Sequence, residues 1–196
     1  MRILVGCEYS GTLRNAFRER GHEAFSCDLL PDDNNSEFHF QCDIFDVIND
    51  KWDMACFFPP CTYLCSSGLH WNKKRPERVK LTEDALDFVE KLLNSPIDKI
   101  LLENPIGCIS TRIRKPDQII QPWQFGHPES KATCLWLKNL PLLVPTNVLT
   151  KTGKYWDNQT PSGQNKLTPS ADRWKIRSKT YEGIAKAIAE QYTNVI

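Results

Sequence analysis

The sequence lacks any apolar run near the ~20 residues that a membrane-spanning helix needs. It also lacks internal repeats and low-complexity tracts. Its first residues turn polar too soon for a secretory signal peptide, so we expect a cytoplasmic protein with no membrane partner. Net charge is nearly absent, at +1 for 196 residues, which excludes a simple polyanion binder. The composition therefore predicts one globular domain over residues 1–196, present as a monomer or a small homo-oligomer.

Cysteine is plentiful, with eight residues. In the absence of a secretory signal we expect free thiols and no disulfide framework. Zinc is an alternative use for Cys61, Cys65 and His70, together with His127 and Cys134. Their spacing matches no common zinc motif, so we predict no metal.

Short apolar runs alternate with amphipathic patterns in the first half of the chain. Alternation of this kind is typical of an α/β fold with a mostly parallel, doubly wound sheet. We predict strands at residues 2–6, 23–27, 38–42, 54–58 and 100–102. We predict helices from an N-cap at Ser10 to a stop at Gly21, over 82–93, and over 181–192.

The segment 105–170 differs from what precedes it, because it is weakly periodic and rich in Pro, Gly, Asn and Trp. We expect irregular structure there, with a short hairpin or helix near 132–140. Residues 110–180 hold 12 Lys and Arg against 4 Asp and Glu, whereas residues 1–109 hold 12 against 18. The chain therefore divides into a core (1–104), a basic substrate segment (105–170) and a closing helix region (171–196). The excess of basic residues predicts an electropositive face on the later segment, or simply a solvated surface.

Two short motifs follow neighbouring predicted strands. Pro59-Pro60-Cys61 follows one buried strand, and Glu103-Asn104 follows the next. Adjacent parallel strands end at one edge of a sheet, so Cys61 and Glu103 would face one pocket. A thiolate that adds to C6 of a pyrimidine, with a carboxyl that supplies a proton to N3, activates C5 toward an electrophile. A buried cysteine in a proline turn is the alternative interpretation.

These motifs resemble the Pro-Cys and Glu-Asn signatures of the DNA cytosine-5 methyltransferase family. The chain is most similar to short cytosine-methyltransferase-like proteins of bacteriophages, whose segments resemble residues 123–127, 133–137 and 172–175. The resemblance implies a Rossmann-like class I methyltransferase fold without a large target-recognition domain. It also implies S-adenosylmethionine as methyl donor, a flipped or single-stranded cytosine in DNA as substrate, and the cytoplasm of a bacterial host cell as the location.

The same resemblance assigns roles to further residues. The turn after the first strand stands where the family keeps its glycine-rich donor loop, and acids end the second and third strands where it binds ribose and adenine. The implied cofactor-binding residues are Gly6, Glu8, Ser10, Gly11, Asp28, Asp43 and Pro59. The implied substrate-binding residues are Asn104, Arg112, Arg114, Trp123, His127 and Arg173.

The sequence departs from the family pattern in the donor loop, where Glu8 stands in the place of the first glycine. A carboxylate there would repel the donor's own carboxylate or bind its amino group. Only about 65 residues lie between Pro105 and the closing segment, so we expect a short or poorly discriminated target. Two alternatives stay open: a non-catalytic phage protein that binds nucleic acid or a host factor, and a pyrimidine-modifying enzyme that acts on free nucleotides.

Overall fold

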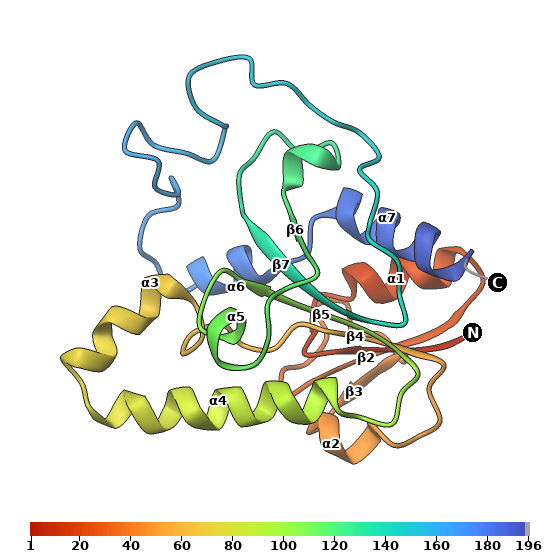
Figure 1. The fold of residues 1–196 in the computed structure, drawn as a ribbon. Helices are drawn as coiled ribbons and strands as arrows, with labels where there is room; N and C mark the ends of the chain where they lie inside the picture. Colours follow the sequence, from red (N-terminus) through yellow and green to blue (C-terminus); the bar gives the residue numbers. More distant parts are fainter. Residues whose placement is uncertain (195–196) are drawn as a thin grey trace.

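The computed structural model describes residues 1–194, which form a seven-stranded mixed sheet in the order β3-β2-β1-β4-β5-β7-β6 (Figure 1). Strands β1 to β5 are parallel, whereas β7 runs antiparallel to β5 and β6. The mostly parallel sheet and the pairing of β4 with β5 are as predicted. The strands are β1 (Arg2–Gly6), β2 (Glu23–Asp28), β3 (His39–Gln41), β4 (Met54–Phe57), β5 (Lys99–Pro105), β6 (Gln118–Ile120) and β7 (Thr133–Lys138).

Helices cover both faces of the sheet (Figure 1). On one face, α1 (Thr12–Glu19) packs beside α7 (Glu182–Thr193), and on the other lie α2 (Ile44–Val47) and α4 (Glu77–Leu93). Each face buries one apolar cluster, in which a large side chain contributes about 1.5–3 kcal/mol. The remaining short helices are α3 (Ser66–Leu69), η1 (His70–Lys73), α5 (Ile109–Arg112), η2 (Pro122–Gln124) and α6 (Arg173–Ser178). No helix of residues 1–194 has the length and apolar character needed to cross a membrane.

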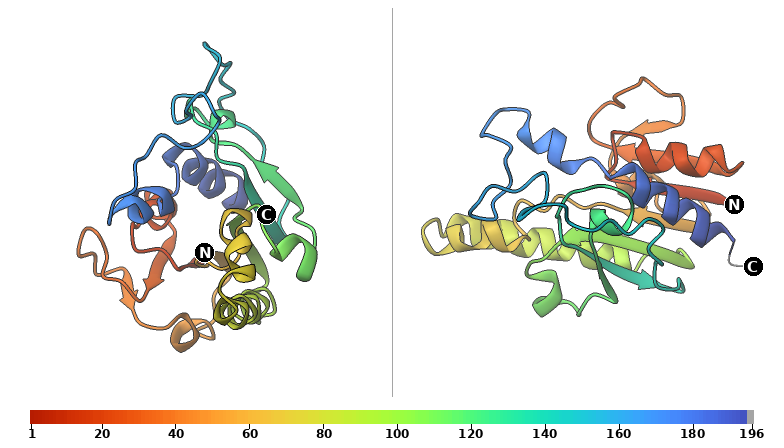
Figure 2. Two further views of the ribbon diagram at one scale, coloured as in Figure 1. Left: turned by 90° about the vertical axis from the view of Figure 1, so that its left-hand side faces the viewer. Right: turned by 90° about the horizontal axis from the view of Figure 1, so that it is seen from above.

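The segment predicted to be mainly irregular contributes two strands to the sheet. β7 fills the stretch where a hairpin or helix was expected, and β6 pairs with it. Trp136 on β7 is fully buried, and its indole N–H donates to the Arg114 carbonyl at 2.8 Å. Residues 141–172 then leave the sheet as a long loop that returns at α6 (Figure 2).

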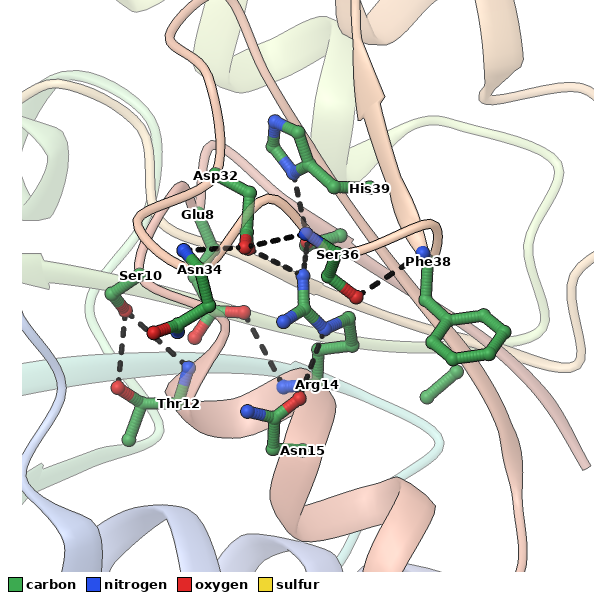
Figure 3. A network of polar contacts seen from close by, with 12 residues as sticks. Glu8, Ser10, Thr12, Arg14, Asn15, Asp32, Asn34, Ser36, Phe38 and His39 are labelled. Atoms are coloured by element: carbon green, nitrogen blue, oxygen red, sulfur yellow. Dashed lines mark hydrogen bonds and ion pairs between the residues drawn. The ribbon is translucent and has the colours of Figure 1, made fainter.

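A buried polar network holds the beginning of α1 (Figure 3). The Glu8 carboxylate accepts from the backbone N–H groups of Leu13 (2.7 Å) and Arg14 (3.3 Å). The Arg14 guanidinium donates to Asp32 (2.6 Å) and Ser26 (2.8 Å). Because these charges are buried, each depends on its partners, and removal of one partner from such a pair costs about 3–5 kcal/mol. The network therefore fixes the turn between β1 and α1.

Glycine is required in this turn. Gly11, and not the predicted Ser10, is the N-cap of α1, and its backbone is left-handed with a φ of 69°. A Cβ at this position would lie 2.2 Å from a guanidinium nitrogen of Arg14. Gly11 thus leaves the space that the buried Arg14 side chain occupies.

The Glu8 network predicts a pH dependence of stability. Burial raises the pKa of Glu8 from 4.5 to about 7. Between these values the folded protein keeps a proton that the unfolded chain has released, so the Glu8 contribution to the free energy of unfolding falls as pH rises. We expect Glu8→Gln to remove about 3 kcal/mol of this fall, measured by denaturant unfolding across that range. The matched control is Glu19→Gln, an exposed carboxylate at the end of α1; an unchanged slope for Glu8→Gln would contradict the prediction.

Candidate active site at the carboxyl ends of the strands

The exit from β4 is tied to the end of β5 by one buried side chain. Asn104 is 1% exposed, and its amide donates to the Pro59 carbonyl at 2.7 Å. The amide oxygen of the same side chain is buried without a hydrogen-bond partner among residues 1–194. Pro59 and Pro60 stiffen the exit because their φ angles are fixed and they donate no backbone hydrogen bond. The chain then turns through Cys61, whose carbonyl accepts from the N–H of Cys65 at 2.9 Å.

Cys61 and Glu103 lie at the same edge of the sheet, as the sequence predicted. β4 pairs with β5 up to Phe57 and Leu102, so Glu103 begins the part of β5 that extends past the end of β4. Both residues are partly exposed, and the Glu103 charge acts on the Cys61 thiol. Burial raises the pKa of Glu103, while the positive charge of Lys131 lowers it. The carboxyl of Glu103 is therefore easier to protonate than an exposed one, and its charge acts on the Cys61 thiol.

Lys131 is a site residue that the sequence did not single out. Its positive charge favours the ionised form of both Cys61 and Glu103. The ammonium group donates to the Arg177 carbonyl at 3.1 Å and lies 5.9 Å from the Tyr181 ring centroid. Lys131 belongs to no sequence motif. It reaches the site because β7, which begins two residues later, pairs with β5.

A second cysteine of the same turn, Cys65, acts on the thiol of Cys61. Its interaction with Cys65, followed by burial, raises the pKa of Cys61. The same interaction lowers the pKa of Cys65 to about 5. The sulfur of Cys65 also lies 3.2 Å from the Ser67 hydroxyl oxygen. The acidic thiol of the site is therefore Cys65, four residues after the predicted nucleophile.

A cavity of about 110 Å³ lies beside this edge, at the carboxyl ends of β1 and β2. Asp28 and Asp43 line it together with the apolar side chains of Ile44 and Phe88. Cys7, in left-handed backbone with a φ of 60°, also faces it. Burial and the charges of Asp28 and Asp43 raise the pKa of Cys7, and burial raises the pKa of Asp28. A lining that combines two carboxylates with apolar side chains suits a ligand that has hydroxyl or amino groups and a flat ring.

The other residues predicted to bind a cofactor lie around or away from this cavity. Gly6 packs against Ile44, since a Cβ on it would lie 2.7 Å from the Ile44 side chain. Pro59 precedes Pro60, which lines the cavity. Ser10 lines a separate polar hollow along α1 and α7. Glu8 is buried beneath the start of α1, where its carboxylate accepts from two backbone amides, and it does not line this cavity.

The two predicted nucleotide-binding arginines are engaged in ion pairs. Arg112 makes two hydrogen bonds to Glu83 on α4, at 3.1 and 2.7 Å. Arg114 pairs with Asp117 at 2.8 Å and donates to the Leu137 carbonyl. Both pairs are exposed, so they cost little to break. A role in substrate binding would require exchange of these partners.

The remaining predicted substrate residues are placed as follows. The Nε2 atom of His127 accepts from the Gly183 N–H at 2.9 Å, so the ring fixes the start of α7. Trp123 stacks on Trp156, with ring centroids 5.7 Å apart and planes 4° apart. Arg173 begins α6, and its buried Nε has no hydrogen-bond partner among residues 1–194.

Helix α6 connects the cavity side of the site with the Lys131 side. Tyr9, after β1, donates its hydroxyl to the Lys175 carbonyl at 3.1 Å. Lys179 pairs with Asp33 at 2.7 Å, and the Arg177 carbonyl binds Lys131 as described above. Tyr9 was not singled out by the sequence, because its partner lies far along the chain.

Comparison with known proteins gives distant similarity to solved structures and no match in sequence. No known family model matches the chain, and no curated protein matches it. A solved structure from E. coli, described as a candidate DNA modification methyltransferase encoded within a prophage, is similar at a TM-score of 0.44 and 16% identity. The match covers 74% of this chain and 51% of that one, so the chain spans about half the length of that protein. Within residues 1–194, no three His, Cys, Asp or Glu side chains are grouped to hold a metal ion.

The tie between the two strand ends predicts a stability effect. Asn104→Ala removes the donor of the Pro59 carbonyl, and we expect the free energy of unfolding to fall by about 1–3 kcal/mol. Asn49→Ala, at an exposed turn, is the matched control and should stay within about 0.5 kcal/mol of the parent protein. Equal values for the two variants in urea unfolding would show that the tie contributes nothing.

Proposed function

We propose that this protein transfers a methyl group from S-adenosylmethionine to C5 of cytosine in DNA. The observation that carries the proposal is the placement of Cys61 and Glu103 at one strand edge, beside a cavity lined by two carboxylates. The sequence motifs at these positions resemble those of cytosine-5 methyltransferases. Placement and resemblance support the same chemistry from independent directions.

The lining of the cavity suits the ribose and adenine part of the proposed donor. Asp28 and Asp43 offer acceptors for the ribose hydroxyls and the adenine amino group, and Ile44 and Phe88 offer an apolar surface for the ring. The donor, when bound, supplies an electrophilic methyl group. The backbone amides at the start of α1 already donate to Glu8, so they are not free to bind the donor. The residues at the ends of β2 and β3 would therefore provide most of the contacts to the donor.

The chain's own residues would act on the pyrimidine as follows. The Cys61 thiol releases its proton to solvent, the resulting thiolate adds to C6, and the Glu103 carboxyl donates its proton to N3. Burial raises the pKa of Glu103, which favours the protonated carboxyl that this step requires. Lys131 balances the negative charge that would build up between the two groups. After methylation, water accepts the C5 proton, N3 returns its proton to Glu103, and the bond from C6 to sulfur breaks.

The choice of DNA rests on charge and aromatic surface. Residues 110–180 carry 12 Lys and Arg against 4 Asp and Glu, which suits contacts to phosphates. Trp174 on α6 is 50% exposed and lies between Arg173 and Lys175, a pattern that suits stacking on unpaired bases. A flipped or already single-stranded cytosine would reach Cys61, since a paired base is inaccessible.

Covalent trapping tests the proposal. DNA that contains 5-fluorocytosine cannot release the C5 substituent, so we expect a stable adduct with Cys61 in the presence of S-adenosylmethionine, detected by mass spectrometry. Cys61→Ala should give none, whereas Cys108→Ala, another partly exposed cysteine, should give the full yield. Glu103→Gln should slow adduct formation by about 10²–10⁴-fold.

The alternatives give different results in the same assay. An adduct with the free nucleotide but none with DNA would favour an enzyme of nucleotide metabolism. Absence of any adduct, together with retained binding of DNA, would favour a non-catalytic nucleic-acid-binding protein. Either result would overturn the proposed function.

A further inference from the structure

Two of the six tryptophans lie on the surface near the candidate active site. Trp71 is 41% exposed and Trp174 is 50% exposed, whereas the other four are buried or partly buried. A large aromatic side chain gives up the stabilisation of burial when it is left in water, so its exposure beside a candidate site indicates a binding role. These two rings are therefore candidate contacts for a partner of the site.

The chain places Trp71 close to the turn of the predicted nucleophile. The Cys61 carbonyl accepts from the N–H of Cys65 at 2.9 Å, and α3 and η1 follow Cys65 without a break. Six residues of helix rise by about 10 Å, which sets the distance between Cys65 and Trp71. The Arg78 guanidinium donates to the Thr62 carbonyl at 3.2 Å, so the start of α4 is also joined to this turn.

Helix α6 brings Trp174 to the same edge from the other face of the sheet. α3 and η1 lead into α4 on one face, whereas α6 leads into α7 on the opposite face. The Tyr9 hydroxyl donates to the Lys175 carbonyl at 3.1 Å, and the Lys131 ammonium donates to the Arg177 carbonyl at 3.1 Å. Both α3 and α6 lie on the side of the molecule where the parallel strands end (Figure 1). The two exposed rings thus flank the edge that carries the predicted nucleophile.

Each of the two rings has a cation beside it. The Lys74 ammonium nitrogen and the Arg75 guanidinium carbon lie 5.2 and 5.3 Å from the ring centroid of Trp71. The Lys175 ammonium nitrogen lies 5.7 Å from the ring centroid of Trp174. A base that stacks on either ring would therefore bring its phosphate group close to a positive charge.

The stretches of chain around the two rings carry an excess of positive charge. Residues 70–80 hold five Lys and Arg against one Glu, and residues 172–179 hold four against one Asp. Within residues 1–194, ion pairs engage only Lys80 and Lys179 among these cations. Exposed aromatic rings interleaved with free cations are typical of surfaces that bind single strands, where rings stack on bases and cations follow the backbone.

We propose that the DNA bound at this site is single-stranded, with a base on one side of the target cytosine stacked on Trp71 and a base on the other side stacked on Trp174. This inference rests on the proposed function. In a duplex each base is stacked between its neighbours and offers a free face only when it is flipped out. A single strand offers the faces of all its bases, so it can occupy both rings at once.

Fluorescence anisotropy of a dye-labelled strand tests the surface without any methyl transfer. The strand has about 16 nucleotides, with one central cytosine among thymines, and the duplex of the same sequence is measured at the same salt concentration. We expect the strand to bind at least about tenfold more tightly than the duplex, because only the strand can stack on both rings.

Substitutions of the two rings test their contribution. Trp71→Ala and Trp174→Ala should each weaken binding of the strand by about 5- to 150-fold, and Phe at either position should restore most of the affinity because a ring remains. The matched control is Phe45→Ala, which removes an exposed ring on α2 that also has a lysine nitrogen 6.0 Å from its centroid. This variant should bind the strand like the parent protein.

The outcomes separate this inference from the proposed function. Duplex binding as tight as strand binding, alanine variants that bind like the parent protein, or no binding of DNA at all would overturn the inference; in the last case the surface would fit an acidic protein instead. Tighter binding of the RNA of the same sequence would overturn it as well. Binding of the strand that depends on both rings, without any adduct on 5-fluorocytosine DNA, would support the inference and overturn the proposed function.

Discussion

The hydrogen bond from Asn104 to the Pro59 carbonyl is the constraint on which the site depends. It joins the ends of two neighbouring parallel strands beyond the point where their regular pairing stops. The two prolines that leave β4 cannot take part in the ladder, so a side chain has to replace the missing backbone bonds. Cys61 lies two residues after Pro59, and Glu103 directly precedes Asn104. Their separation is therefore fixed by the sheet and not by a flexible loop.

The other half of the site is organised without a glycine-rich loop. Glu8 occupies the first amides of α1, and Arg14 fills the space that Gly11 leaves open. A ligand at this edge would meet acids at the ends of the next strands, and not free helix amides. The charge of Arg14 is balanced by Asp32, so the β1–α1 turn is rigid even though it carries buried charges.

Most of the core could be predicted from the sequence, because apolar runs and helical periodicity report burial directly. β6 and β7 were not predicted, since their short runs become strands only through pairing with β5. Cys61 and Glu103 could be placed together from strand order alone. The acidity of Cys65 could not, although its spacing of four residues from Cys61 was visible. The sequence also does not reveal the backbone amides and carboxylates that bind Glu8, His127, Arg112 and Arg114 here.

The central step of the proposed chemistry is the addition of the Cys61 sulfur to C6, which makes C5 reactive. Release of tritium from DNA labelled at C5 of cytosine measures this chemistry most directly, because the label can leave only after C5 has become nucleophilic and accepted an electrophile. We predict release that requires S-adenosylmethionine and stops in Cys61→Ala. DNA that becomes methylated while it keeps all of its C5 tritium would contradict the account.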